Sequence, residues 1–199
     1  MSYHVDAYLV SGQKLKALTS GKKDHLETIL KDIDSKRSAS DFVQRLDAEF
    51  AEDHVQGCPT APEALQALVK GQAQQVTEWE YMYGYALQLL CETYGTTLGN
   101  AGFEAVNSVE LLVDLEVFSA RVLKLRVYDE FFAMPPDLPL PLSEYPMIGF
   151  LPLSRAQKIA ANFNQLNLEH PDFGKSLATI QSWVDQMLIE KQDLVTFFY

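Results

Sequence analysis

The sequence predicts an α+β fold, a mainly helical single domain over residues 1–199 with a small sheet that pairs its N-terminal and C-terminal strands. Apolar and polar residues alternate over residues 3–10, which is typical of a half-buried strand. Residues 194–199 are rich in β-branched and aromatic side chains, which favour a second strand. Between these ends, apolar residues recur mostly at helical spacing, which predicts about eight helices. Because the ends of a domain often lie close together, we expect the two strands to be neighbours.

Helical patterns fill most of the first half of the chain. The apolar residues of the first patterns share a spacing of three or four positions: Leu15, Leu18, Leu26, Ile29, Leu30, Ile33, Phe42, Leu46 and Phe50. The clearest helix covers residues 60–71, where Thr60 and Glu63 form a capping box. A run of alternating aromatic residues then changes to helical spacing, which predicts a helix over residues 83–94. The glycine-rich residues 95–107 are expected to form a loop.

Prolines divide the second half of the chain. Residues 134–152 hold six of the nine prolines, so we expect an extended connector with an edge strand over residues 147–151. An apolar stripe over residues 111–125 predicts a long helix before the connector. Two further helices should follow it, the first of them behind a capping box of Ser154 and Gln157.

Charge and cysteine content limit the classes of function. The formal net charge is -11 at pH 7, which repels the phosphates of nucleic acids and the headgroups of anionic membranes. The two cysteines form neither a disulfide framework nor a metal-binding motif, which fits a reducing compartment. No apolar run is long enough to span a membrane, and the first residues carry no basic leader. We therefore expect a cytoplasmic protein that binds no nucleic acid and no membrane and carries no metal or cofactor.

One group of residues could form a nucleophilic site. His54 and Cys58 are four positions apart, so one helical turn would bring an imidazole and a thiol together, and Asp53 or Glu52 could orient the imidazole. Gly57 and Pro59 flank the cysteine, however, which disfavours a continuous helix. A free cysteine is also more often a small buried residue than a nucleophile. The enzyme alternative is therefore a small hydrolase-like protein that uses the Cys58–His54 pair, and the simpler interpretation is a helix end with a structural cysteine.

A second group of residues could form a recognition surface. Residues 71–120 contain no Lys or Arg but seven carboxylates. Four candidate binding residues lie in this segment: Trp79, Glu80, Tyr81 and Tyr83. Packing in a core, with the tyrosine hydroxyls reaching polar partners, is the simpler interpretation of these aromatic residues. The alternative is a recognition surface, because such residues provide a large contact area with a polar group at one end. We expect a non-catalytic protein-binding or regulatory module whose acidic aromatic surface engages a basic protein partner.

Four segments of the chain carry a family resemblance: residues 2–10, 83–91, 145–149 and 194–199. They are similar to segments of a family of uncharacterised bacterial proteins of this length, a domain of unknown function. The last helix, which contains Trp183, and the strand after it more remotely resemble the YfbM-like proteins, whose function is unknown. The resemblance implies a bacterial cytosolic protein and assigns no catalytic residue.

Overall fold

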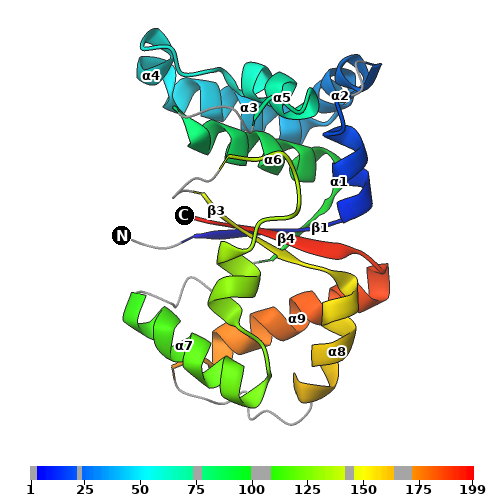
Figure 1. Cartoon of the computed structure of the whole chain (residues 1–199), viewed down its shortest axis with the longest axis vertical. Coiled ribbons are helices and arrows are strands. Elements are labelled where there is room, and N and C mark those ends of the chain that lie inside the picture. The colour runs from blue at the N-terminus through cyan, green and yellow to red at the C-terminus, as the bar shows by residue number, and fades with distance from the viewer. Residues whose placement is uncertain (1–3, 22–23, 74–77, 100–108, 142–145, 164–171) are drawn as a thin grey trace. The chain divides into compact units, whose positions relative to one another are not determined.

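The computed structural model describes residues 4–21, 24–73, 78–99, 109–141, 146–163 and 172–199, and of residues 24 and 109–112 only the backbone. Figure 1 shows its elements. In chain order they are β1 (Val5–Val10), α1 (Gly12–Leu18), α2 (Asp24–Ser35), α3 (Arg37–Glu49), α4 (Ala51–Val55), α5 (Ala61–Val69), α6 (Glu80–Tyr94), β2 (Thr96–Leu98), α7 (Val109–Val122), the π-helix η3 (Asp129–Ala133), β3 (Met147–Leu151), α8 (Leu153–Phe163), α9 (Gly174–Glu190) and β4 (Asp193–Phe198).

The predicted fold class is confirmed. The chain is mainly helical, with ten helices in its described part, and its four strands form one antiparallel sheet in the order β2-β1-β4-β3 (Figure 1). The N-terminal strand β1 pairs with the C-terminal strand β4, with Val5 opposite Phe198 and Val10 opposite Asp193. The predicted edge strand is β3, which pairs with the other side of β4. The last strand of the chain therefore lies in the middle of the sheet.

The chain divides into two compact units, each assembled from separate segments. The sheet unit comprises residues 1–12, 97–136 and 147–199 and contains the strands with α7, η3, α8 and α9. The helical unit comprises residues 13–96 and 137–146 and contains the helices from α2 to α6 and all of α1 except its first residue, Gly12, which belongs to the sheet unit. A single domain over the whole chain stays a prediction, because a compact unit need not be able to fold alone.

Three elements differ from the sequence-based expectations. The short helix α4 is separate from α3, because Phe50 between them departs from helical geometry, with ψ of 20°. Strand β2 occupies the start of the expected loop, and residues 100–108 of that loop lie outside the described residues. In the π-helix η3 the adjacent Phe131 and Phe132 are both buried. Two consecutive buried residues do not match the spacing of an apolar helix face, so the sequence pattern did not predict this helix.

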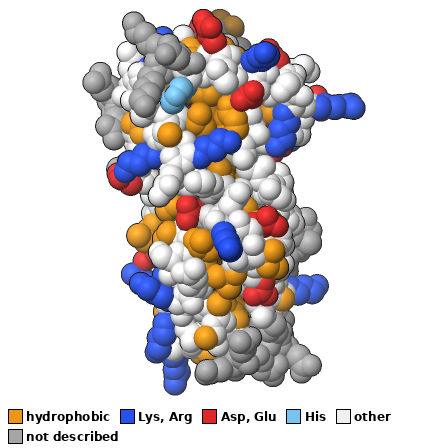
Figure 2. Space-filling model, turned by 90° about the vertical axis from the view of Figure 1, so that its right-hand side faces the viewer, with side chains coloured by type: hydrophobic (Ala, Val, Ile, Leu, Met, Phe, Trp, Pro, Cys, Tyr) orange, Lys and Arg blue, Asp and Glu red, His pale blue; other side chains and the backbone are white. Residues whose placement is uncertain are grey.

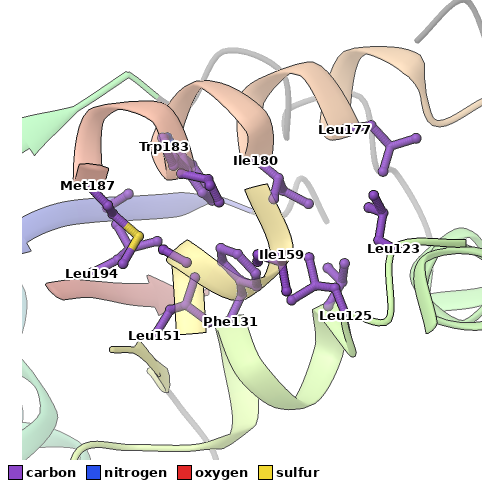
Figure 3. Close-up of a cluster of buried hydrophobic side chains, with 14 of the residues drawn as sticks. Leu123, Leu125, Phe131, Leu151, Ile159, Leu177, Ile180, Trp183, Met187 and Leu194 are labelled. Carbon is purple, nitrogen blue, oxygen red and sulfur yellow. The ribbon is translucent and has the colours of Figure 1, made fainter. Parts of the chain in front are cut away.

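The core of the sheet unit lies between one face of the sheet and the helices of that unit. Figure 3 shows side chains from η3, β3, α8, α9 and β4 that point toward one another. Trp183 is the largest fully buried side chain, and its ring centroid lies 6.0 Å from that of Phe131. Its indole Nε1 donates a hydrogen bond to the carbonyl oxygen of Gly99 over 2.8 Å. The polar atom of this large side chain is thus satisfied inside the core.

The carboxylate of Asp193 holds the first residues of two helices. Its Oδ2 accepts the N–H of Gly12, the first residue of α1, and its Oδ1 accepts the N–H of Leu153, the first residue of α8, each over 2.8 Å. The first N–H groups of a helix lack partners within it, so an anion at this point is stabilising. The predicted capping box is corrected accordingly, because α8 begins one residue before Ser154 and is capped from β4.

Gly149 lies where β3 passes closest to η3. A Cβ at this position would overlap the backbone carbonyl group of Phe131. The hydroxyl of Thr196 donates a hydrogen bond to the same carbonyl oxygen, which fixes it from the β4 side. The close approach of the two backbones therefore requires glycine.

We expect Gly149→Ala to lower the free energy of unfolding by on the order of 3 kcal/mol, because backbone rather than a flexible side chain would have to move. Urea denaturation followed by circular dichroism measures the change. Gly99→Ala is the matched control, since no atom of the described residues lies within 4 Å of a Cβ at that position. The control should lose less than about 0.5 kcal/mol, and an equal loss at both glycines would contradict this account of the β3–η3 contact.

Candidate functional site

The residues of the predicted nucleophilic group lie in the helical unit, where α4 ends. Asp53 and His54 belong to the last turn of α4, and Gly57 follows with a φ of 101°, in the left-handed region that favours glycine. The turn brings Cys58 back over the helix end, where its backbone N–H donates to the carbonyl of Asp53 over 3.1 Å. The chain therefore does not continue as one helix from His54 to Cys58.

The imidazole of His54 faces the backbone of Cys58 rather than its thiol. Nδ1 donates to the carbonyl oxygen of Cys58 over 3.0 Å, and Nε2 lies 3.7 Å from Oδ1 of Asp47. The same Oδ1 accepts the N–H of Ala61, the first residue of α5, over 2.8 Å. Among the described residues Nε2 has no hydrogen-bond partner. His54 and Asp47 together link the end of α4 to the start of α5.

The hydroxyl of Tyr81 connects the other two members of the group. It donates to Oδ2 of Asp53 over 2.9 Å, and its oxygen lies 3.6 Å from Sγ of Cys58. Burial raises the pKa of Tyr81 far above its ordinary value, and the hydrogen bonds with Cys58 and Asp53 raise it further. The phenol therefore stays protonated and acts as a hydrogen-bond donor.

The thiol of Cys58 is buried, with 4% of the residue exposed. Burial raises the pKa of this thiol, the hydrogen bond with Tyr81 lowers it by a smaller amount, and the charge of Asp53 raises it again. The thiol also donates a weak hydrogen bond to the carbonyl oxygen of Pro59, with Sγ and the oxygen 3.6 Å apart. A nucleophilic cysteine needs a lowered pKa and a base in contact with the thiol, and the described residues supply neither. The arrangement favours a structural cysteine.

We expect Cys58 to resist alkylation in the folded protein, because its thiol is buried and its pKa is raised. Cys91→Ala leaves Cys58 as the single thiol, and mass spectrometry follows its reaction with iodoacetamide between about pH 6 and about pH 9. The rate should be at least about 100-fold below that of the same variant unfolded in urea. Rapid labelling of the folded variant well below the ordinary thiol pKa of about 8.5 would instead indicate an activated thiol.

The predicted binding residues separate onto two faces of α6. Tyr81 shares a face with Tyr85, which lies four positions later and was not among the predicted binding residues, and both are partly exposed. Tyr83 is 6% exposed and belongs to the buried face. Trp79 and Glu80, where α6 begins, are also partly exposed. Because the segment is helical, alternate aromatic residues do not form one row as they would along a strand.

Phe50 completes a group of four rings in contact. Its ring centroid lies 5.1 Å from that of Tyr81 and 5.6 Å from that of Tyr85. Trp79 and Tyr81 meet edge to face at 6.1 Å, and Tyr81 and Tyr85 do so at 6.4 Å. All four residues are partly exposed, and we call them the aromatic cluster. Phe50 was not among the predicted binding residues, because its spacing from earlier apolar residues of its helix indicated the core.

Trp79 has a backbone conformation that is uncommon for a large residue. Its φ is 59° and its ψ is 34°, in the left-handed region. This conformation costs on the order of 1 kcal/mol for a residue other than glycine. The carbonyl of Trp79 accepts the N–H of Met82 over 3.0 Å, so the strained residue opens the first turn of α6.

Carboxylates lie beside the aromatic cluster. Asp53 and Glu80 are partly exposed, and Glu49 is exposed. Burial and the nearby charge of Glu49 raise the pKa of Tyr85 to about 12, against a smaller opposing effect of Arg45. Figure 2 shows the side of the helical unit that carries α1 and α2, where Lys and Arg side chains are interspersed with carboxylates.

The described residues offer no ready site for a metal ion. No group of three or more His, Cys, Asp or Glu side chains in this part of the chain is arranged to hold one. Nor is any helix within the described ranges long and apolar enough to cross a membrane.

Comparison with known protein families yields one match. The model of a domain of unknown function, DUF7691, matches residues 1–199. The chain belongs to this family. No curated protein and no solved structure matches the DUF7691 chain. Membership of a family of unknown function is thereby confirmed, while the bacterial source and the likeness to YfbM-like proteins stay predictions.

Proposed function

We propose that this DUF7691 protein is a non-catalytic binding module whose aromatic cluster and adjacent carboxylates engage a basic protein partner. The supporting observation is the cluster itself, in which four rings contact one another while none is fully buried. Tyrosine and tryptophan bury a large area with little loss of side-chain freedom, so they dominate the energetics of many protein interfaces. A partly exposed group of such rings is suited to that role.

The charge of the partner follows from the charge of the chain. The net charge is -11, and the segment that supplies Trp79, Glu80, Tyr81 and Tyr85 contains no Lys or Arg. A positive partner is therefore attracted at long range, which raises its association rate and makes binding sensitive to salt. The charge of Arg45 acts on Tyr85 of the cluster, and its guanidinium lies over the ring of Phe42.

The backbone of Trp79 also supports a recognition role. Strained residues persist only where the surrounding structure holds them, and they often occur at binding sites. A tryptophan held in one conformation loses less freedom on binding than one on a mobile loop. The strain at the start of α6 is then the cost of a pre-organised contact.

We expect Glu49→Gln combined with Glu80→Gln to weaken binding of the partner, because the double variant removes two charges beside the aromatic cluster. The measurement is affinity capture from an extract of the source organism, with bound protein released by stepwise salt and quantified by mass spectrometry. A basic protein should be retained by the unmodified chain and released by salt, and the double variant should retain at most about a tenth as much.

The matched control is Glu27→Gln combined with Asp34→Asn, which removes the same charge from two exposed positions of α2. This variant should retain the partner as the unmodified chain does. If both double variants lose the partner equally, net charge rather than the aromatic cluster is responsible. If no captured protein is released by salt, the proposed function is wrong.

A further inference from the structure

Two tyrosine–aspartate pairs lie at opposite ends of α6. Tyr94, the last residue of the helix, donates its hydroxyl to Oδ2 of Asp32 over 2.7 Å. Tyr81, the second residue, donates its hydroxyl to Oδ2 of Asp53 over 2.9 Å. In both pairs burial raises the pKa of the phenol most, and the hydrogen bond to the carboxylate raises it further. The two pairs are chemically alike, so their surroundings can be compared directly.

A cation of the chain itself covers the first pair. The Nζ of Lys14 lies 4.2 Å from the centroid of the Tyr94 ring, within the range of a cation–π interaction. The face of an aromatic ring has partial negative charge, which attracts the ammonium. The Asp32 carboxylate, which accepts the hydrogen bond of the Tyr94 hydroxyl, adds to this attraction. Lys14, Tyr94 and Asp32 therefore form a complete set of cation, ring and carboxylate.

No Lys or Arg of the described ranges covers the second pair in this way. Among the described residues, no Lys or Arg lies over the ring of Tyr81 or forms an ion pair with Asp53. The second carboxylate oxygen of Asp53, Oδ1, accepts no hydrogen bond from these residues either. His54 is the adjacent basic side chain, but its ring nitrogens face Cys58 and Asp47. The Tyr81–Asp53 pair is thus an incomplete copy of the set at the other end of α6.

We propose that the Tyr81–Asp53 pair receives the cationic head of one lysine or arginine side chain of the partner, in the place that Lys14 takes at Tyr94. This inference rests on the proposed function and names the contact at its centre. Trp79, Tyr85 and Phe50 around Tyr81 would cover the apolar stem of the inserted side chain. The carboxylate of Asp53 provides the charge that selects a cation over an apolar side chain.

The test uses three decapeptide probes, in which arginine, lysine or glutamate alternates with glycine. Trp79 reports binding through its fluorescence, because it contacts Tyr81 while the other tryptophan, Trp183, is fully buried. At about 50 mM salt, where surface charges are weakly screened, the arginine and lysine peptides should bind and the glutamate peptide should not. Equal responses to all three peptides would overturn the proposal.

Substitutions of single carboxylates distinguish the contribution of the Tyr81–Asp53 pair from that of the surrounding surface. Asp53→Asn should weaken binding of the cationic peptides about tenfold, whereas Asp32→Asn, the same change at the pair that Lys14 covers, should leave it within about twofold. If Glu49→Gln with Glu80→Gln weakens binding but Asp53→Asn does not, the proposed function survives and this contact is wrong. If neither change weakens binding, both are wrong.

Lys14→Met supplies a second readout that does not depend on the folding of the Asp53 variant. It uncovers the Tyr94–Asp32 pair, so calorimetry should detect a second site for the arginine peptide. Lys31→Met is the control, because it removes the same charge from an exposed position of α2 and should add no site. A second site in both variants, or in neither, would show that a tyrosine–aspartate pair is not sufficient to hold a cation here.

Discussion

The sheet unit depends on the pairing of β4 with both of its neighbours. Val195, in the middle of β4, lies opposite Tyr8 on one side and Phe150 on the other. A two-stranded ribbon is marginally stable alone, so neither β1 nor β3 forms a lasting sheet before β4 joins them. Leu194 and Phe198 of β4 also belong to the core that contains Trp183. Because β1 and β4 are far apart in the sequence, their pairing closes a long loop, which is expected to slow folding.

The same strand fixes where two helices begin. Asp193 is the first residue of β4, and the residue that it caps at the start of α1, Gly12, lies 181 positions earlier in the chain. A Cβ at Gly12 would lie 2.9 Å from the ring of Phe150 in β3, so a larger residue at this position would require that ring to shift. Sheet pairing, helix capping and close packing thus converge at one end of β4. Loss of the strand would remove all three together.

The sequence predicted those parts of the molecule whose cause is local. The capping box at the start of α5 is one example, since both the N–H and the hydroxyl of Thr60 donate to the carboxylate of Glu63 over 2.9 Å. The pairing of β1 with β4 was also predicted, although the strands are distant in the sequence, because each has a local strand pattern and chain ends often lie close together. The sequence did not predict β2, η3 or the cap of α8, where contacts between distant segments decide the structure. The candidate site divides in the same way. Trp79 and Tyr81 were identifiable from composition, whereas Phe50 joins them only because α3 packs against α6.

The two ends of α6 show why carboxylates at the start of this helix are stable without a neighbouring Lys or Arg among the described residues. The carbonyl groups at the C-terminal end carry partial negative charge. The ammonium of Lys36 compensates this charge by donating a hydrogen bond to the carbonyl of Glu92 over 2.5 Å. The N-terminal end carries partial positive charge, which stabilises Glu80 in the first turn by roughly 0.3–1 kcal/mol. This stabilisation declines within one turn and is weakened by salt. The carboxylate of Glu80 is therefore stabilised in the free protein but can still attract a cation. A cation in direct contact with the ring of Tyr81 acts at shorter range and in a less hydrated place, and it therefore adds stabilisation that the helix cannot supply.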